Sequence, residues 1–195
     1  AGNINHTRIA FNIDSTAPTL TIEAPGNHSN SSSNTLDVTY KAADAAIQSC
    51  WYSNDTFLNN VTLTDCGTNI TTVTWSEGTH NSIVYANDTN GNINSSTVRF
   101  TIDTITPVIS ISSPANGSTS GDTGLDVNYS VSDTALDKCW YSNDTFAGNI
   151  SLSCGTNITT VTWAVGQHNV TVWANDTAGN INHTRIAFNI DSTAP

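Results

Sequence analysis

Basic residues are scarce in this sequence. Its 195 residues include five Lys and Arg against 16 Asp and Glu, which gives a formal net charge of −11. Binding of nucleic acid requires clustered Lys and Arg that neutralise phosphates, so the composition excludes that class of partner. An anionic membrane surface is disfavoured for the same reason. No apolar run approaches the roughly 18 residues of a membrane span, so we expect no membrane insertion in this segment.

Methionine is absent, and no signal-peptide pattern is present, so we expect a mature or internal segment of a longer protein. Charged residues make up only 11% of the chain, against roughly 25% in an ordinary soluble domain. Neutral polar residues take their place, with 53 Ser and Thr and 25 Asn. Because side-chain charge supplies little hydration here, covalently attached sugar is the candidate source of solubility.

Two levels of internal repeat organise the chain. Residues 1–18, AGNINHTRIAFNIDSTAP, reappear unchanged as residues 178–195, and a looser repeat aligns residues 19–107 with residues 108–195. A repeat of this length indicates an array of similar domains. We therefore predict three segments: 1–17 as the last strand of a preceding repeat, 18–106 as one domain, and 107–195 as a second domain.

Each unit has the pattern of an all-β domain. Short runs rich in Val, Ile, Thr and aromatic residues alternate with Asn, Asp, Gly and Ser. Val170, Val172 and Ala174 alternate with Thr171 and Trp173, a period of two that is typical of a half-buried strand. No segment shows sustained helical periodicity. About seven short strands in a unit of this size predict tandem immunoglobulin-like β-sandwiches.

The run GQHNVTVWANDTAGNIN, followed by FNIDSTAP, resembles the closing strands and linker of bacterial and archaeal immunoglobulin-like repeats in large cell-surface proteins. The CWYSND element is similar to versions of that repeat in archaeal surface proteins. The resemblance covers nearly the whole chain and implies an extracellular, cell-surface or secreted protein. It implies no particular ligand, because that family includes stalks, fibres, surface-layer components and adhesins.

The four cysteines fall as one local pair in each unit, Cys50 with Cys66 and Cys139 with Cys154. Three connectivities are possible in principle. Only pairing within a unit keeps the two copies equivalent, so we predict two local disulfides and an oxidising compartment. Closing a loop of this length stabilises a domain by about 3 kcal/mol in the chain-entropy description.

The pattern Asn-x-Ser/Thr, with x not Pro, is the acceptor for N-linked glycan. Random arrangement of this composition gives about 7 acceptors, whereas the sequence contains 16. Six recur in both units, and Asn60-Val-Thr matches Asn149-Ile-Ser, so the acceptor persists while its neighbours change. Turn chemistry is the alternative for the NDT acceptors at Asn87 and Asn175. We predict N-linked glycans over the set Asn5, Asn27, Asn30, Asn54, Asn60, Asn69, Asn87, Asn94, Asn116, Asn128, Asn143, Asn149, Asn157, Asn169, Asn175 and Asn182.

Acidic residues near the domain junctions are candidates for calcium binding. None of them has the oxygen-rich spacing of a calcium loop, so turn formation or capping is the favoured role. We therefore expect no metal site and no cofactor other than the glycans. The candidates are Asp44, Asp88, Asp103, Asp133, Asp176 and Asp191.

Enzymatic activity is not expected, because the sequence lacks the G-x-S-x-G, H-E-x-x-H and glycine-rich phosphate-binding motifs. His80 and His168 each precede a strand pattern, and we expect them in turns. Either one, with two cysteines, supplies at most three of the four ligands of a structural zinc site. An aromatic sugar-binding platform is possible, but core packing is the favoured role of Trp51, Trp75, Trp140 and Trp163.

These observations predict a structural repeat segment of an extracellular fibre, stalk or sheath, whose partners are its own neighbouring repeats. The first alternative is the stalk of a cell-surface adhesin with its binding head elsewhere. The second is a non-catalytic spacer of an extracellular enzyme. Residues 1–17 belong either to one continuous chain or to a strand donated between subunits.

Overall fold

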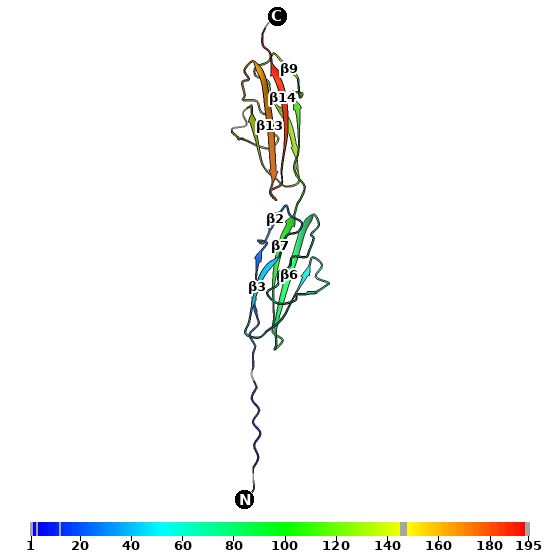
Figure 1. The fold of residues 1–195 in the computed structure, drawn as a ribbon, viewed down its shortest axis with the longest axis vertical. Coiled ribbons are helices and arrows are strands. Elements are labelled where there is room, and N and C mark those ends of the chain that lie inside the picture. The colour runs from blue at the N-terminus through cyan, green and yellow to red at the C-terminus, as the bar shows by residue number, and fades with distance from the viewer. Residues whose placement is uncertain (1, 3, 12, 145–147, 194–195) are drawn as a thin grey trace. The chain divides into compact units, whose positions relative to one another are not determined.

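The computed structural model describes residues 2, 4–11, 13–144 and 148–193 (Figure 1). Their regular elements are all β-strands, and among them there is no helix with the length and apolarity to cross a bilayer. The chain forms two compact units, the first mainly from residues up to 101 and the second mainly from residue 102 onward. We call them unit 1 and unit 2. The prediction of an all-β fold is confirmed.

Unit 1 contains seven strands in two sheets. β1 pairs antiparallel with β3, and the other five strands lie in the order β2-β7-β6-β4-β5. The strands are β1 (Thr19–Ala24), β2 (Ser29–Ser31), β3 (Thr39–Ala43), β4 (Ile47–Asn54), β5 (Val61–Thr62), β6 (Gly78–Asp88) and β7 (Ile93–Ile102).

Unit 2 repeats this arrangement. β8 pairs antiparallel with β10, and a five-stranded sheet has the order β12-β11-β13-β14-β9, in which only the short β9 runs parallel to its neighbour β14. Seven strands in two sheets agree with the predicted immunoglobulin-like sandwich. The strands are β8 (Val108–Ser113), β9 (Thr119–Ser120), β10 (Asn128–Ser132), β11 (Leu136–Asn143), β12 (Ile150–Leu152), β13 (Gly166–Asp176) and β14 (Ile181–Ile190).

The two-residue period decides which side chains enter the core. In β13, Val170, Val172 and Ala174 are fully buried, whereas Trp173 is only half-buried. Successive side chains of a strand point to opposite faces, so Trp173 lies on the outer face of its sheet. Thr171, on the same outer face, is buried as well.

One tryptophan lies in the core of each unit. The indole Nε1 of Trp75 donates a hydrogen bond to the carbonyl oxygen of Leu36 at 2.8 Å, and its ring meets Phe100 edge to face with centroids 4.9 Å apart. Trp163 makes the equivalent hydrogen bond and ring contact in unit 2. Such pairs satisfy the buried N–H and add to the energy of apolar burial. Core packing is therefore confirmed for these two tryptophans.

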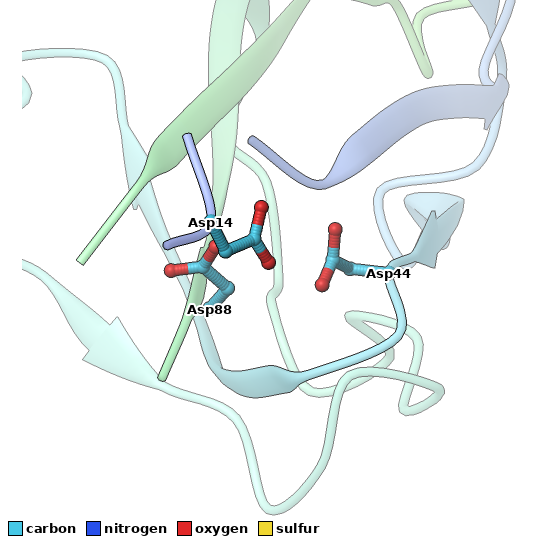
Figure 2. Close-up of side chains that lie close together, drawn as sticks. All are labelled: Asp14, Asp44 and Asp88. Atoms are coloured by element: carbon cyan, nitrogen blue, oxygen red, sulfur yellow. The ribbon is translucent and has the colours of Figure 1, made fainter. Parts of the chain in front are cut away.

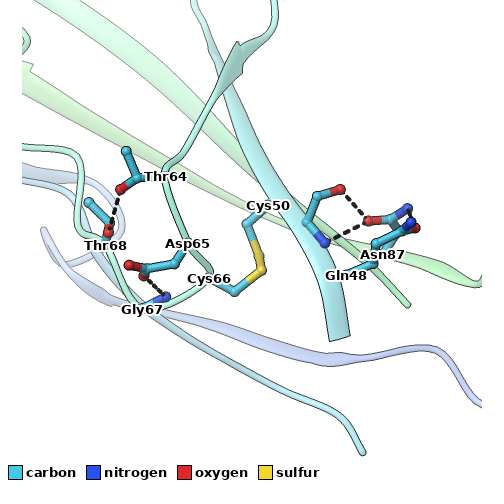
Figure 3. Close-up of a disulfide and its surroundings, with 9 residues drawn as sticks. Gln48, Cys50, Thr64, Asp65, Cys66, Gly67, Thr68 and Asn87 are labelled. Atoms are coloured by element: carbon cyan, nitrogen blue, oxygen red, sulfur yellow. Dashed lines mark hydrogen bonds between the residues drawn. A yellow bond between two sulfur atoms is a disulfide. The ribbon is translucent and has the colours of Figure 1, made fainter. Parts of the chain in front are cut away.

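Both predicted disulfides are present. Cys50 bonds to Cys66 and Cys139 bonds to Cys154, each with a Cα–Cα distance of 5.1 Å. Figure 3 shows that Cys50 lies on a strand and Cys66 in an irregular loop beside it. The bond thus links β4 to the loop that follows β5, and its counterpart links β11 to the loop that follows β12.

The described residues before Pro18 form no strand. The side chains of Ile4, Ile9, Phe11 and Ile13 are largely exposed. The identical sequence at positions 181–190 forms β14 and contributes to the core of unit 2. The assignment of residues 1–17 to a preceding repeat stays a prediction.

Candidate functional site

Every predicted glycan acceptor reaches the surface. None of the sixteen asparagines is buried; nine are exposed and seven are partly exposed. The exposed group is Asn5, Asn27, Asn30, Asn60, Asn69, Asn94, Asn116, Asn149 and Asn157. The partly exposed group is Asn54, Asn87, Asn128, Asn143, Asn169, Asn175 and Asn182.

Two equivalent acceptors use their amide nitrogen to hold the start of a unit. Nδ2 of Asn94 donates to the carbonyl oxygen of Pro18 at 2.8 Å, and Nδ2 of Asn182 donates to that of Pro107 at 2.9 Å. The side-chain oxygen of each also accepts from the next backbone N–H. Asparagine therefore has a structural role at this position in both units, which explains its recurrence without reference to glycan.

A second equivalent pair joins neighbouring strands. Nδ2 of Asn87 donates to Oε1 of Gln48, and its Oδ1 accepts from the backbone N–H and the hydroxyl of Ser49 (Figure 3). Asn175 donates to Oδ2 of Asp137 and accepts from a backbone N–H of the same strand. These are the NDT acceptors for which turn chemistry was the alternative, and the structure places them within strands.

At two further pairs only the side-chain oxygen is engaged. Oδ1 of Asn27 and of Asn116 accepts a backbone N–H from the last strand of its unit. Oδ1 of Asn69 and of Asn157 accepts the N–H of a core tyrosine. The glycan bond forms at Nδ2, so these oxygens can keep their hydrogen bonds when the nitrogen carries sugar. Structural use and glycosylation are compatible at these four positions.

Three carboxylates face a common space in unit 1, as Figure 2 shows. Carboxylate oxygens of Asp14, Asp44 and Asp88 lie within 4.8 Å of one another, and Asp88 is fully buried. Burial alone would raise the pKa of Asp88, but hydrogen bonds from the side chain and backbone of Asn92 and from the backbone of Asn90 hold that pKa below its ordinary value. Nδ2 of Asn92 also donates to the backbone carbonyl of Asp14 at 3.0 Å.

Unit 2 contains the equivalent cluster of Asp103, Asp133 and Asp176. Its members also accept backbone N–H groups two residues ahead, as Asp133 does from Ala135 at 2.7 Å, which is the capping role that the sequence favoured. Three converging carboxylates are the donor set that a hard cation such as Ca²⁺ prefers, so these residues could hold one. Asp191, also a candidate, accepts instead from Thr193.

The sequence reasoning did not single out Asp14. A signal was available, because Asp14 and Asp103 occupy the same place in the segments FNIDSTAP and FTIDTITP. Spacing along the chain could not show that this position meets two other segments of the same unit.

The expectation that His80 and His168 lie in turns is wrong. Both are buried within strands, β6 and β13, and their rings lie against a core tryptophan and a core phenylalanine. Nδ1 of His168 contacts the carboxylate of Asp144 at 3.0 Å, and Nε2 lies 2.7 Å from the carbonyl oxygen of Ala164. Burial lowers the pKa of His168, but these two acceptors outweigh it and raise the pKa above its ordinary value.

Core packing, the favoured role of Trp51 and Trp140, is also wrong. Trp140 lies between the buried Cys139 and Tyr141 on β11, so it points to the outer face of the sheet. It stacks on Trp173 with centroids 6.4 Å apart, and Trp51 stacks on Tyr85 in unit 1 at 5.3 Å. Each unit therefore has an aromatic pair on its outer surface.

The fold and the surface together define a tandem immunoglobulin-like β-sandwich protein with one disulfide and one outer aromatic pair in each unit. No family model matches the chain. The sequence is 29% identical over 191 residues to halomucin of Haloquadratum walsbyi (strain DSM 16790 / HBSQ001). That alignment covers 95% of this chain and 2% of halomucin, so the chain spans a small fraction of the length of that relative.

Solved structures share the fold. The fibronectin(III)-like modules of CbhA from Clostridium thermocellum match with a TM-score of 0.54 and 14% identity, covering 89% of this chain and 94% of theirs. Extracellular domains 3–5 of Drosophila OTK match with a TM-score of 0.56 and 18% identity, covering 89% of this chain and 62% of theirs. Identities this low show the fold alone.

Proposed function

We propose that this chain is a structural repeat segment of a heavily N-glycosylated extracellular protein that forms a fibre, stalk or sheath. The observation that carries the proposal is that none of the sixteen acceptor asparagines is buried, and that fifteen of them lie on disulfide-bonded sandwich units. The acceptors whose Nδ2 is free of a hydrogen bond among the described residues, such as Asn60 and Asn149, are its main sites.

The composition indicates that the glycans would supply hydration to the surface. Only 11% of residues are charged, so the protein part of the surface holds water mainly through neutral hydroxyl and amide groups. Sugar hydroxyls add hydration without charge, and bulky glycans beside short edge strands such as β5 and β12 hinder pairing with other chains.

The disulfides support an extracellular location, because such bonds persist in oxidising compartments. The likeness to a protein named halomucin supports it as well, since mucin-like stalks are glycosylated extracellular segments. The unchanged 18-residue repeat supports a regular array, in which each pair of domains presents the same surface to its neighbours.

The modification itself is a group transfer. Nδ2 of asparagine forms a bond to the anomeric carbon of a sugar and loses a proton, while the activated phosphate of the sugar donor leaves. The donor and the transferase come from the host cell. The Ser or Thr two residues later completes the pattern that such an enzyme reads.

Intact-mass measurement of material from a glycosylating host tests the proposal. We expect a mass well above the 20.6 kDa of the polypeptide, falling to that value after enzymatic or chemical removal of N-glycans. Site-resolved glycopeptide mapping then identifies the occupied asparagines. A mass of 20.6 kDa before treatment contradicts the proposal.

A further inference from the structure

The outer face of the five-stranded sheet in unit 2 carries a row of three rings. Trp140 on β11 lies opposite Trp173 on β13, and Trp173 lies opposite His183 on β14. The first two ring centroids are 6.4 Å apart and the second two are 6.1 Å apart. Both tryptophans remain partly exposed and His183 is exposed. An apolar surface of this kind is stabilised when another group covers it.

A glycan acceptor lies at the edge of this row. A groove of about 490 Å³ is lined by both Trp140 and Asn149, together with Ser151, Leu152 and Cys154. Ser151 is the direct cross-strand partner of Trp140. Asn149 directly precedes β12, two residues before Ser151, and it lines the same groove as Trp140.

The side chain of Asn149 is available for modification. It is exposed, and it makes no hydrogen bond to the part of the chain that the structure describes. Ser151 is both the third residue of this acceptor and the residue facing the tryptophan. A sugar on Asn149 therefore begins its path at the rim of the groove, not away from it.

Unit 1 has the same arrangement with different residues. Thr62 is the cross-strand partner of Trp51 and the third residue of the acceptor at Asn60. Asn60 is exposed, and Tyr85 takes the place of the second tryptophan in the stacked pair. Both units thus have an outward tryptophan beside an Asn-x-Ser/Thr acceptor, although the neighbouring residues differ. Val61, Thr62 and Tyr85 of unit 1 correspond to Ile150, Ser151 and Trp173 of unit 2.

We propose that the glycan on Asn149 folds back over Trp140 and occupies this groove, and that the glycan on Asn60 does the same over Trp51. The inference rests on the proposed function, because it requires the acceptors to be occupied. A sugar ring has an apolar C–H face and a polar rim. The C–H face covers the indole, while Ser151, Ser153 and Lys138 at the groove offer polar contacts to the rim.

The covalent link strengthens this contact. A weak stacking interaction between free sugar and tryptophan becomes intramolecular when the sugar is attached beside it, so its effective concentration is high. The ordered first sugars then form part of the surface of the unit, and the outer aromatic row is shielded without being buried by protein.

Hydroxyl-radical footprinting of the full glycosylated chain tests the inference, with oxidation at Trp140 measured by peptide mass spectrometry. Asn149→Gln removes the acceptor by replacing the asparagine. Ser151→Ala removes it by replacing the third residue of the pattern and leaves the asparagine in place. We expect the oxidation rate of Trp140 to rise several-fold in both variants. The buried Trp163 reports intact folding, and Trp51 in unit 1 is expected to keep its rate.

Thr159→Ala is the matched control. It removes the acceptor at Asn157, which does not line the groove, by an equally small change at an exposed residue. Trp140 should oxidise at the wild-type rate in this variant.

Glycopeptide mapping of the same samples separates the two possible failures. An occupied Asn149 with an unchanged Trp140 rate in both variants overturns the inference and leaves the proposed function standing. An empty Asn149 on a chain with other acceptors occupied has the same consequence. A chain without any glycan overturns the proposed function itself, and the inference falls with it.

Discussion

The same 18 residues occur twice in this chain and lie in two different environments. Phe188 is 2% exposed in the core of unit 2, whereas Phe11, at the equivalent position of the first copy, is 80% exposed. Ile186 is buried beside Phe188, and its counterpart Ile9 is exposed. The second copy contains a strand, β14, paired along its length with β13, whereas the described residues of the first copy form none.

Because the two sequences are identical, local propensity cannot account for the difference. The second copy is ordered by its neighbours: β13 supplies hydrogen bonds along one edge, β9 along the other, and the core receives alternate side chains. The apolar alternation in this segment specifies which face will be buried once a sheet is present. It does not by itself make a strand, in line with the strong context dependence of β-propensity.

Removing each copy in turn gives the largest contrast. Truncation after Asn180 deletes β14 with three buried side chains, each worth about 2–5 kcal/mol, which together are comparable to the whole stability of a typical domain. We expect unit 2 to unfold, with its β13 amides exchanging freely in hydrogen-exchange mass spectrometry. Deletion of residues 1–11 should leave the exchange of both units unchanged. Protected β13 amides in the truncated chain would show that β14 is dispensable.

A single substitution in each copy sharpens the comparison. Phe188→Ala removes a buried ring that meets Trp163 edge to face, so we expect the free energy of unfolding of unit 2 to fall by about 3–5 kcal/mol. Phe11→Ala is the matched variant and should change stability by less than about 0.5 kcal/mol. Urea denaturation followed by tryptophan fluorescence measures both. Equal effects at the two positions would mean that the first copy is also packed.

The two copies also contain the same glycan acceptor, Asn-His-Thr. Asn5 is exposed and makes no hydrogen bond within the described residues, whereas Nδ2 of Asn182 donates to the carbonyl oxygen of Pro107. We expect site-resolved glycopeptide mapping to find several-fold higher occupancy at Asn5. Asn94, which holds Pro18 in the same way, should resemble Asn182. Equal occupancy of Asn5 and Asn182 contradicts this structural reading.

The smallest effect concerns the pH dependence of the contact between His168 and β14. The ring of His168 lies 5.8 Å from that of Phe188, its cross-strand partner. Its pKa is raised in the folded unit, so the stabilisation is complete below the unfolded value of about 6.5 and is lost as pH rises through the folded value. Thermal melts of unit 2 should show a modest decrease in Tm as pH rises from about 6.5 through the raised pKa of the folded unit.

His168→Gln is the control for this dependence. It removes the titrating ring, so the pH slope assigned to unit 2 should disappear. A slope that persists in the variant assigns the titration to another group.

Much of the architecture was predictable from the sequence because it follows from local rules. Cysteine pairing required only that the two units be equivalent, and the period of two placed Val170 and Val172 in the core. The same rule places Trp140 on the face opposite to its neighbour Cys139, which is buried.

The remaining features depend on contacts that spacing does not encode. The aspartate clusters bring together residues about 30 and 45 positions apart along the chain, from three separate segments. The burial of His80 and His168 depends on Asp55 and Asp144, which directly follow β4 and β11 and contact Nδ1 of each ring. The structural roles of Asn94 and Asn182 could not be predicted from the sequence, because the Asn-x-Ser/Thr pattern does not show which atom the amide nitrogen contacts.

The disulfides have a consequence for proteolysis. The segment between Cys50 and Cys66 includes exposed apolar residues such as Phe57 and Leu58, the kind of loop that proteases cut first. A single cut there leaves both fragments joined through sulfur, so the nicked unit remains one covalent molecule. Such damage becomes visible only on reduction, and a chain of these units keeps its mechanical continuity after its loops have been cleaved.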